Sequence, residues 1–264
     1  MVAATNTGKQ IVIRIKRGEA GKESFWEEFA IPYKANMNVI SCLMEIQRNP
    51  VTQDGKKTTP VAWDQACLEE VCGSCTMNVN GKVRQACTAL IDHLAQPVTL
   101  EPMTKFPLIR DLCVDRHSMF QNLKRVRAWI PIDGTYDLGP GPREAQSDQQ
   151  QEYVMSTCMT CGCCLEACPQ VNSASDFIGP AAINQVRRFN MHPTGKLNAP
   201  ERLRAVMGKG GVQECGKAQN CVKVCPKQIP LTSSIAVIER DTVKQAIKDF
   251  FSGGDEGSGP SGPM

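Results

Sequence analysis

The amino-acid sequence predicts an α+β protein with two domains. Strand-like alternation of apolar residues is confined to the first part, helical spacing dominates the second, and each part carries its own group of cysteines. The 264 residues are enough for two ordinary domains. We expect a domain of strands and one helix over residues 1–117, a mostly helical domain over 118–252, and a disordered tail over 253–264, which is rich in glycine and proline.

The strands of the first domain are predicted from alternation and turn residues. In IVIRIKR, the residues Ile11, Ile13 and Ile15 share one face, and FWEEFAIPY follows as a second strand. Asn80-Gly81 stands between apolar residues, which is a strong signal for a tight hairpin. The segment QPVTLEPM predicts one more strand.

One helix interrupts these strands. Val39, Leu43 and Ile46 recur at helical spacing, and Pro50 ends the run. Strands with a single helix crossing them make a small α+β domain.

The second domain follows a connection, residues 128–150, that is rich in Gly, Pro and Asp. No strand pattern returns after it. Pro180 opens the helical stretch PAAINQVRRFN and Pro200 opens PERLRAVM. The segment SSIAVIERDTVKQAIKDFF predicts an amphipathic helix.

Composition narrows the class of protein. The chain is 41% apolar and 22% charged, as soluble globular proteins are, and its formal net charge of +3 is spread out, so no basic stripe indicates nucleic acid. No apolar run approaches the roughly 18 residues needed to cross a bilayer, and the start, MVAATNTGKQ, lacks the apolar core of a secretory signal. We expect a cytosolic protein that contacts a membrane only through a partner.

The fourteen cysteines are the unusual feature of the composition. Disulfide-rich domains are short and carry an export signal, whereas clustered thiols in a reducing compartment are metal ligands more often. We therefore expect metal ligation.

The first cysteine group lies in CLEEVCGSCTMNVNGKVRQAC, where Cys67, Cys72, Cys75 and Cys87 have the spacing C-x4-C-x2-C-x11-C. Folding the hairpin brings the fourth cysteine to the first three. Gly73 allows the backbone to wrap closely and to point N–H groups at the sulfurs. This spacing is typical of plant-type [2Fe–2S] ferredoxins. The alternative is a zinc site with four cysteines, which usually shows two C-x2-C pairs rather than one.

The second group lies in CMTCGCCLEACP, residues 158–169. Cys158, Cys161, Cys164 and Cys168, followed by Pro169, fit C-x2-C-x2-C-x3-C-P. In that pattern the fourth cysteine binds the other cluster of a pair. Three sulfurs therefore serve one centre, one sulfur serves a second, and both centres need ligands from elsewhere.

The segment CGKAQNCVKVCP, residues 215–226, supplies those ligands. Cys225, also followed by proline, completes the centre formed by Cys158, Cys161 and Cys164, which we expect to be [4Fe–4S]. Cys215 and Cys221 join Cys168 at the second centre. The same frame laid on this segment puts Ala218 at the fourth ligand position. Because alanine has no thiolate, we expect [3Fe–4S] there; a fourth iron held by water or another side chain is the alternative.

Three cysteines remain outside these sets. Cys163 fits neither frame and is interpreted as a small buried apolar residue, as are Cys42, in the helical pattern, and Cys113, in the strand-like LIRDLCVD. Three histidines show no ligand spacing: His93, His117 and His192.

No nucleophile, acid–base pair or phosphate-binding loop is apparent, since the glycines of DLGPGPR lack a strand-to-helix setting. We expect no catalytic residue in this chain. Three iron–sulfur centres of different type form a one-electron relay. Such a relay needs an electron donor and an acceptor outside the chain.

The order of the three cysteine motifs, over roughly residues 10–250, resembles the iron–sulfur subunits of succinate dehydrogenase and quinol:fumarate reductase. The resemblance includes the segments MEIQRNP, CLEEVCGSC, RDLCVDR and CPKQIPL. It implies a plant-type ferredoxin-like (β-grasp) domain followed by an all-α, bacterial-ferredoxin-like domain. It also implies a flavoprotein partner whose FAD oxidises succinate to fumarate, and a membrane-anchor cytochrome b subunit that carries quinone and often haem b. The complex would then lie on the cytoplasmic face of a bacterial inner membrane.

The resemblance implies that electrons pass from FAD through [2Fe–2S], [4Fe–4S] and [3Fe–4S] to quinone. Many ubiquinone-using members have a tryptophan after the cysteine-proline and a histidine after the second [3Fe–4S] ligand. Here the cysteine-proline is followed by QVN, in CPQVN, and Cys215 is followed by Gly216. In lacking both the tryptophan and the histidine, this sequence resembles the branch with di-haem anchors and menaquinone. Pro169 and Ala218 are candidate residues near the quinone.

Three other functions fit parts of the pattern. The same subunit could work as quinol:fumarate reductase, since direction depends on quinone potential. An iron–sulfur sensor would need an output domain, and no DNA-binding helix pair or basic patch is evident. A structural zinc protein would contain zinc in place of iron.

Overall fold

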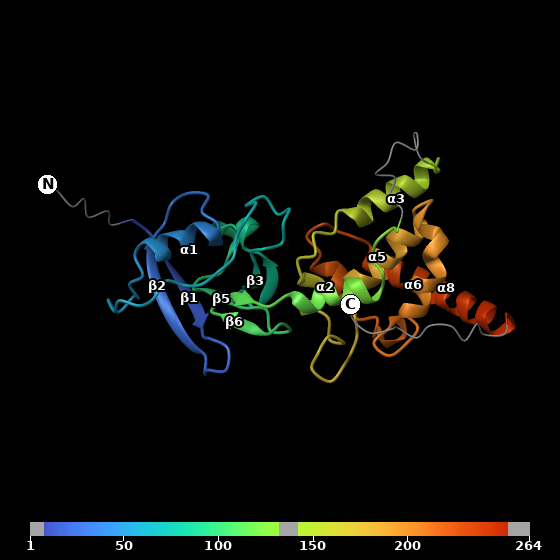
Figure 1. Cartoon of the computed structure of the whole chain (residues 1–264). Helices are drawn as coiled ribbons and strands as arrows, with labels where there is room; N and C mark the ends of the chain where they lie inside the picture. Colours follow the sequence, from blue (N-terminus) through green and yellow to red (C-terminus); the bar gives the residue numbers. More distant parts are fainter. Residues whose placement is uncertain (1–7, 132–141, 253–264) are drawn as a thin grey trace.

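The structure is a computed structural model that describes residues 8–131 and 142–252. The expected tail, residues 253–264, lies outside the described residues, as do residues 132–141 of the expected connection. Figure 1 shows a sheet domain and a helical domain side by side, with helix α2 (His117–Arg125) at their junction. The described residues carry no strand after Val114, as predicted.

The first domain is built on a mixed five-stranded sheet in the order β2-β1-β5-β3-β4. Strand β1 pairs antiparallel with β2 and parallel with β5. The strands are β1 (Gln10–Arg17), β2 (Phe25–Pro32), β3 (Thr76–Val79), β4 (Lys82–Gln85) and β5 (Val98–Glu101).

The alternation in the sequence produces this sheet. Ile11, Ile13 and Ile15 are all buried and form a core with helix α1 (Val39–Arg48), whose apolar face also packs there. Asn80 and Gly81 have φ of 49° and 72°, the conformation that a two-residue type I′ hairpin requires. The hairpin therefore joins β3 to β4 and carries Cys87 back toward the first three cysteines of its motif.

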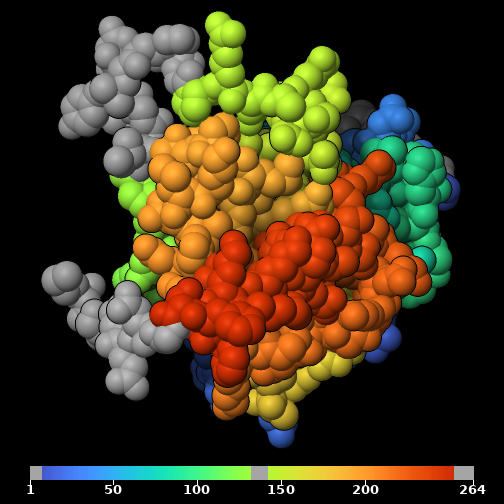
Figure 2. Space-filling view, turned by 90° about the vertical axis from the view of Figure 1, so that its right-hand side faces the viewer, coloured from blue at the N-terminus to red at the C-terminus, as the bar shows by residue number. Residues whose placement is uncertain are grey.

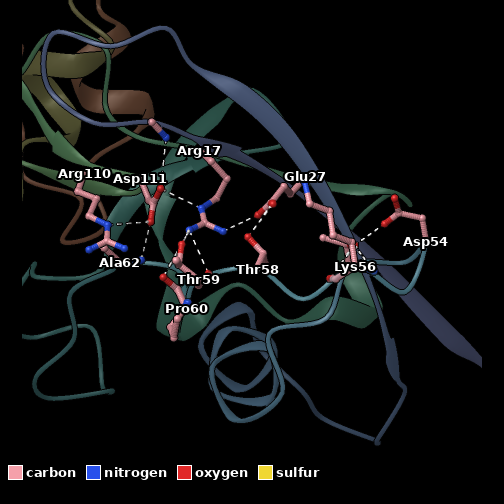
Figure 3. Close-up of polar contacts among 12 residues, drawn as sticks. Arg17, Glu27, Asp54, Lys56, Thr58, Thr59, Pro60, Ala62, Arg110 and Asp111 are labelled. Carbon is pink, nitrogen blue, oxygen red and sulfur yellow. Dashed lines mark hydrogen bonds and ion pairs between the residues drawn. The ribbon is translucent and has the colours of Figure 1, made fainter.

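A buried ion network fixes the segment that leads into the cysteine loop (Figure 3). The guanidinium of Arg17, 3% exposed, donates to Asp111 at 2.8 Å and to Glu27 at 2.5 Å. It also donates to the carbonyl and hydroxyl of Thr59, and Asp111 accepts from the Ala62 N–H at 2.8 Å. Asp111 lies between the short strands β6 (Leu108–Arg110) and β7 (Cys113–Val114). Arg17, Glu27 and Asp111, from three distant parts of the chain, thus bind one another beside residues 59–62.

The second domain consists of helices around two small cores, one of which also includes Val83, Met103, Phe106 and Val114 of the first domain. They are α3 (Gln146–Ser156), α4 (Cys163–Glu166), α5 (Pro180–Met191), α6 (Ala199–Ala205), α7 (Asn220–Lys223) and α8 (Leu231–Phe251), with 3₁₀ turns at Gly195–Asn198 and Val212–Glu214. The helices opened by Pro180 and Pro200 are confirmed. Helix α3 begins inside the segment predicted to be a connection, so that prediction was wrong from Gln146 onward.

Helix α8 crosses one face of the helical domain (Figure 2, red). Its first half is amphipathic, with Ile235 and Ile238 buried against α5. Its second half departs from the predicted pattern, because Ile247 is 53% exposed and Phe250 and Phe251 are each 80% exposed. Within residues 8–131 and 142–252, no helix is both long and apolar enough to span a membrane.

Glu166 in α4 joins the two domains. Its Oε1 accepts hydrogen bonds from the Asn78 side chain at 3.0 Å and from the Thr104 N–H and hydroxyl at 2.7 and 2.8 Å. Its Oε2 accepts from the Lys105 N–H at 2.9 Å. In the sequence, Glu166 lies between Cys164 and Cys168. The residue that contacts the first domain is therefore part of the second cysteine motif.

Candidate iron–sulfur sites

The first cysteine loop wraps around the sulfur of Cys67. The N–H groups of Val71 and Cys72 both point at it, at 3.3 Å, and that of Glu69 at 3.4 Å. The loop achieves this with positive φ at Leu68 (61°) and Glu70 (55°). Backbone donors around a ligand sulfur stabilise its negative charge, as an iron–sulfur cluster requires.

The other three cysteines of the motif lie around the same point. A hydrogen bond with Ser74 lowers the pKa of Cys72 to about 6. Burial and a hydrogen bond with Cys75 together raise the pKa of Cys87 to about 11. Cys67 also raises it electrostatically, so the hairpin brings Cys87 to the loop as expected.

Gly73 is the point where this loop meets the second one. Its φ is +74°, and a Cβ there would lie 2.8 Å from both Cα and Cβ of Cys161. The backbone at Gly73 therefore makes its close approach to Cys161 of the second cysteine motif. Arg116 donates to the carbonyls of Gly73 and Ser74 and so braces the loop.

Cys158, Cys161, Cys164 and Cys225 line one small pocket together with Pro226, and Cys163 lines the same pocket. Burial raises the pKa of Cys164 well above its ordinary value, and the charges of the other three thiols act in the same direction. Cys225, from the segment 215–226, thus stands among three cysteines of the segment 158–169, which lies about sixty positions earlier in the sequence.

Cys168, Cys215 and Cys221 form a third group. Burial raises the pKa of Cys221, and the nearby thiols of Cys168 and Cys215 raise it as well. Ala218 is exposed in the loop between Cys215 and α7, flanked by Lys217 and Gln219, both at positive φ. Pro169, the other residue predicted near a quinone, is also exposed.

The three groups suit iron–sulfur clusters in their chemistry. None of the fourteen cysteines forms a disulfide in the structure. In the part of the chain that the structure describes, no three His, Cys, Asp or Glu side chains converge closely enough to hold a single metal ion. Around a cluster, the ligand sulfurs are spread over several iron atoms.

The cysteines outside these groups differ in their surroundings. Cys42 is fully buried in the first core, as predicted, and burial raises its pKa to about 12. Cys113 is only partly buried, so its assignment to the core was wrong. Cys163 is buried, but it has polar contacts: a hydrogen bond with Cys161 raises its pKa and lowers that of Cys161 to about 7.

Sequence reasoning missed Gln85, the second polar contact of Cys163. Its side-chain amide donates to the Cys163 sulfur at 3.4 Å. No sequence signal distinguishes this residue, because it is one strand position in a hairpin. A surface hollow of 540 Å³ lies elsewhere, between Phe25–Glu28 and Thr52–Lys56, and none of the cysteines lines it.

Two family comparisons match separate parts of the chain. The 2Fe-2S iron-sulfur cluster binding domain matches residues 10–121, and the 4Fe-4S dicluster domain matches residues 154–229. The first covers the sheet domain and the second covers both remaining cysteine motifs. The two matches support the predicted division into an α+β domain and a helical domain.

Whole-chain comparisons agree with this division. The succinate dehydrogenase iron-sulfur subunit of Bacillus subtilis is 61% identical, covering 89% of this chain and 93% of that protein. The fumarate reductase iron-sulfur subunit of Wolinella succinogenes is 30% identical, covering 89% and 98%. A solved structure, the Mycobacterium smegmatis Sdh1 complex in the apo form, has the same fold, with a TM-score of 0.77 at 22% identity over 91% of this chain and 98% of that one. With both cluster-binding domains and these relatives, the chain belongs to the iron–sulfur subunits of succinate dehydrogenase and fumarate reductase.

Proposed function

We propose that the chain holds three clusters and relays electrons through them in a succinate:quinone oxidoreductase. Cys67, Cys72, Cys75 and Cys87 would hold [2Fe–2S]. The proposed [4Fe–4S] ligands are Cys158, Cys161, Cys164 and Cys225, and the proposed [3Fe–4S] ligands are Cys168, Cys215 and Cys221. Bound clusters of this kind accept and release one electron at a time.

The burial of the three groups is the observation that carries this proposal. Cys67 is only partly buried and stands beside Leu68 and Val71, which are 47% and 59% exposed. Cys215 is partly buried at the start of the exposed stretch 216–219. Each group has two buried cysteines, but Met159 and Pro226, beside the partly buried Cys158 and Cys225 of the middle group, are themselves only partly exposed. The exposed chain therefore lies beside the first and third groups, as the two ends of a relay require in order to reach partners.

The partners follow from the family. The [2Fe–2S] end would face the FAD of a flavoprotein that oxidises succinate to fumarate. The other end would face a membrane-anchor cytochrome b subunit that carries quinone and haem b, and the chain would then lie peripherally on the cytoplasmic face of a bacterial inner membrane. Pro169 and Ala218, both exposed beside the third group, would lie near the quinone.

The residues beside the third group favour a menaquinone-type site. Gly216 leaves room that the Gln170 side chain occupies: a Cβ at position 216 would lie 2.5 Å from the Gln170 Nε2. Neither the tryptophan nor the histidine of many ubiquinone-using members is present here. Fumarate reduction is the second candidate activity, because the Wolinella relative is a fumarate reductase subunit. The 61% identity to a succinate dehydrogenase subunit favours succinate oxidation.

Low-temperature EPR tests the cluster assignment. The complex is purified through a tag on this chain and recorded first oxidised, then reduced with dithionite. We expect an oxidised [3Fe–4S] signal and a reduced [2Fe–2S] signal, with a flavoprotein and haem absorbance in the same preparation. Iron-replete protein without an oxidised signal would contradict the three-ligand site at Cys168, Cys215 and Cys221. Rates of succinate oxidation and fumarate reduction by the same preparation decide the direction.

A further inference from the structure

The second half of helix α8 has its polar and apolar sides reversed. The side that faces the protein carries Thr242 and Gln245, which are each 7% exposed. The opposite side carries four exposed apolar residues at the helical spacing i, i+4, i+7 and i+8: Val243 (60% exposed), Ile247, Phe250 and Phe251. A helix that faces water has the opposite arrangement. These four residues, the outer stripe of α8, therefore form a patch that suits an apolar partner.

The end of the helix is held in place, so the outer stripe has a fixed direction. Asp249 lies on the side of α8 away from Ile247, because successive residues are turned by about 100°. The guanidinium of Arg204, in α6, donates to Asp249 at 3.0 and 2.7 Å, and the Gln245 side chain donates to it at 2.8 Å. Helix α8 thus packs on α6 through its polar side and turns the outer stripe outward.

The outer stripe begins just beyond the third group of cysteines. Leu231, at the start of α8, lines the pocket of the proposed [4Fe–4S] ligands. About two turns later, Glu239 binds Lys217, in the loop of the proposed [3Fe–4S] ligands, at 3.3 Å. Val243 follows Glu239 by one turn on the same side of the helix. The helix then continues to Phe251, about 18 Å beyond Glu239 at 1.5 Å per residue, and Figure 1 shows its end on the far side of the helical domain from the sheet domain.

Basic residues border the outer stripe. Arg240, Lys244 and Lys248 are exposed on the same turns of the helix. Asp241 pairs with Arg240 at 3.2 Å and with Lys244 at 3.8 Å, which leaves a surplus of positive charge. Apolar residues flanked by lysine and arginine are typical of helices that lie in the surface of an anionic bilayer, where the long basic side chains reach the phosphates.

We propose that the outer stripe inserts into the headgroup region of an anionic bilayer beside the membrane anchor, an inference that rests on the proposed function. The proposed relay turns the third group of cysteines toward the anchor, so the stripe beyond that group lies on the membrane side. Phe250 and Phe251 would reach the boundary of the acyl chains, while Lys244 and Lys248 bind lipid phosphates. Helix α8 would then attach the chain to the membrane directly, in addition to the anchor subunit.

Flotation of the full-length chain with lipid vesicles tests this attachment without any electron transfer. Vesicles of phosphatidylglycerol and phosphatidylcholine in equal parts are compared with vesicles of phosphatidylcholine alone. Replacing both Phe250 and Phe251 by serine should lower the partition coefficient by about tenfold per phenylalanine, the effect of burying one such side chain. Replacing Lys244 and Lys248 by glutamine should lower binding to the anionic vesicles by about fivefold per lysine and leave binding to the neutral vesicles unchanged.

Phe120→Ser is the matched control. Phe120 is 57% exposed on α2, so its replacement removes an exposed ring from another helix and should leave vesicle binding unchanged. Because Phe250 and Phe251 are each 80% exposed, the double serine variant should fold, and its Tm checks this.

Two results would overturn the proposed attachment. The first is a wild-type chain that does not bind the anionic vesicles, and the second is a double serine variant that binds them as well as the wild type does. If the chain does not bind vesicles but the double serine variant loses its anchor subunit during purification of the complex, the stripe contacts protein instead of lipid. Vesicle binding and the EPR signals are measured separately, so the attachment can fail while the cluster assignment holds.

Discussion

Replacing Gly73 by alanine tests how closely the first two cysteine loops approach each other. The backbone at this position has φ of +74°, which costs a residue other than glycine about 1–2 kcal/mol. The new Cβ would also lie 2.8 Å from Cα and Cβ of Cys161, where ordinary contacts are longer. Forcing an extra carbon into a packed site costs about 1–3 kcal/mol. The sum is a loss of about 2–5 kcal/mol of folding free energy.

Gly55→Ala is the matched control. Gly55 has φ of +84°, but nothing lies within 4 Å of the added Cβ, so only the backbone cost of about 1–2 kcal/mol applies. For a chain of this size, 1 kcal/mol corresponds to about 2–4 °C in Tm. Thermal scans of the purified complexes at one rate should show losses of about 4–20 °C for Gly73→Ala and about 2–8 °C for Gly55→Ala. Equal losses would refute the close contact between the loops.

Three further predictions concern the remaining sites. Ala218→Cys should supply the missing thiolate and convert [3Fe–4S] to [4Fe–4S], so that the oxidised EPR signal disappears; an unchanged signal would show that the two cysteine frames are wrongly aligned. Asp111→Ala removes one of the two carboxylates that face the buried Arg17 guanidinium, with Glu27 left, and removes the acceptor of the Ala62 N–H; it should lower stability by about 1–3 kcal/mol, measured as the Tm of the complex, whereas an unchanged Tm would mean that the network of Figure 3 is not buried in solution. Hydrogen bonds from Arg204 and Gln245 lower the pKa of Asp249 to about 2, so the stability from this contact is present above its ordinary pKa near 3.8 and is lost as the pH falls toward 2; in Arg204→Ala the carboxyl should titrate closer to 3.8 by NMR, and an unchanged pKa would exclude the ion pair.

The sequence carried enough information to predict the fold class and the grouping of the cysteines. Alternation at Ile11, Ile13 and Ile15 and the Asn80-Gly81 turn are local signals, and both produced the expected elements. The two frames that end in Cys-Pro also predicted that Cys225 would lie with Cys158 and Cys164, and the structure brings these side chains together. Their role as ligands remains a prediction.

What the sequence could not predict depends on contacts between distant residues. Helix α3 has the polar sequence QSDQQQEY and no clear apolar stripe, and it packs on α5 through Met155 and a hydrogen bond between Gln151 and Arg187. Arg17 looks like an ordinary exposed strand end until Glu27 and Asp111 surround it. The partners of Cys163 are likewise invisible, because Gln85 lies 78 positions earlier in the chain.

The exchange of cysteines between the two later motifs has a consequence for biosynthesis. The proposed [2Fe–2S] ligands fall within residues 67–87, so a ribosome that has released the first domain has already delivered all four. With the proposed ligands, the centre at Cys168, Cys215 and Cys221 could not be completed until residue 221 has emerged, and the centre that includes Cys225 not until residue 225. A chain truncated before Cys215 would therefore lack ligands for both centres. Insertion of either proposed cluster would tie the C-terminal segment to chain made about fifty to sixty residues earlier.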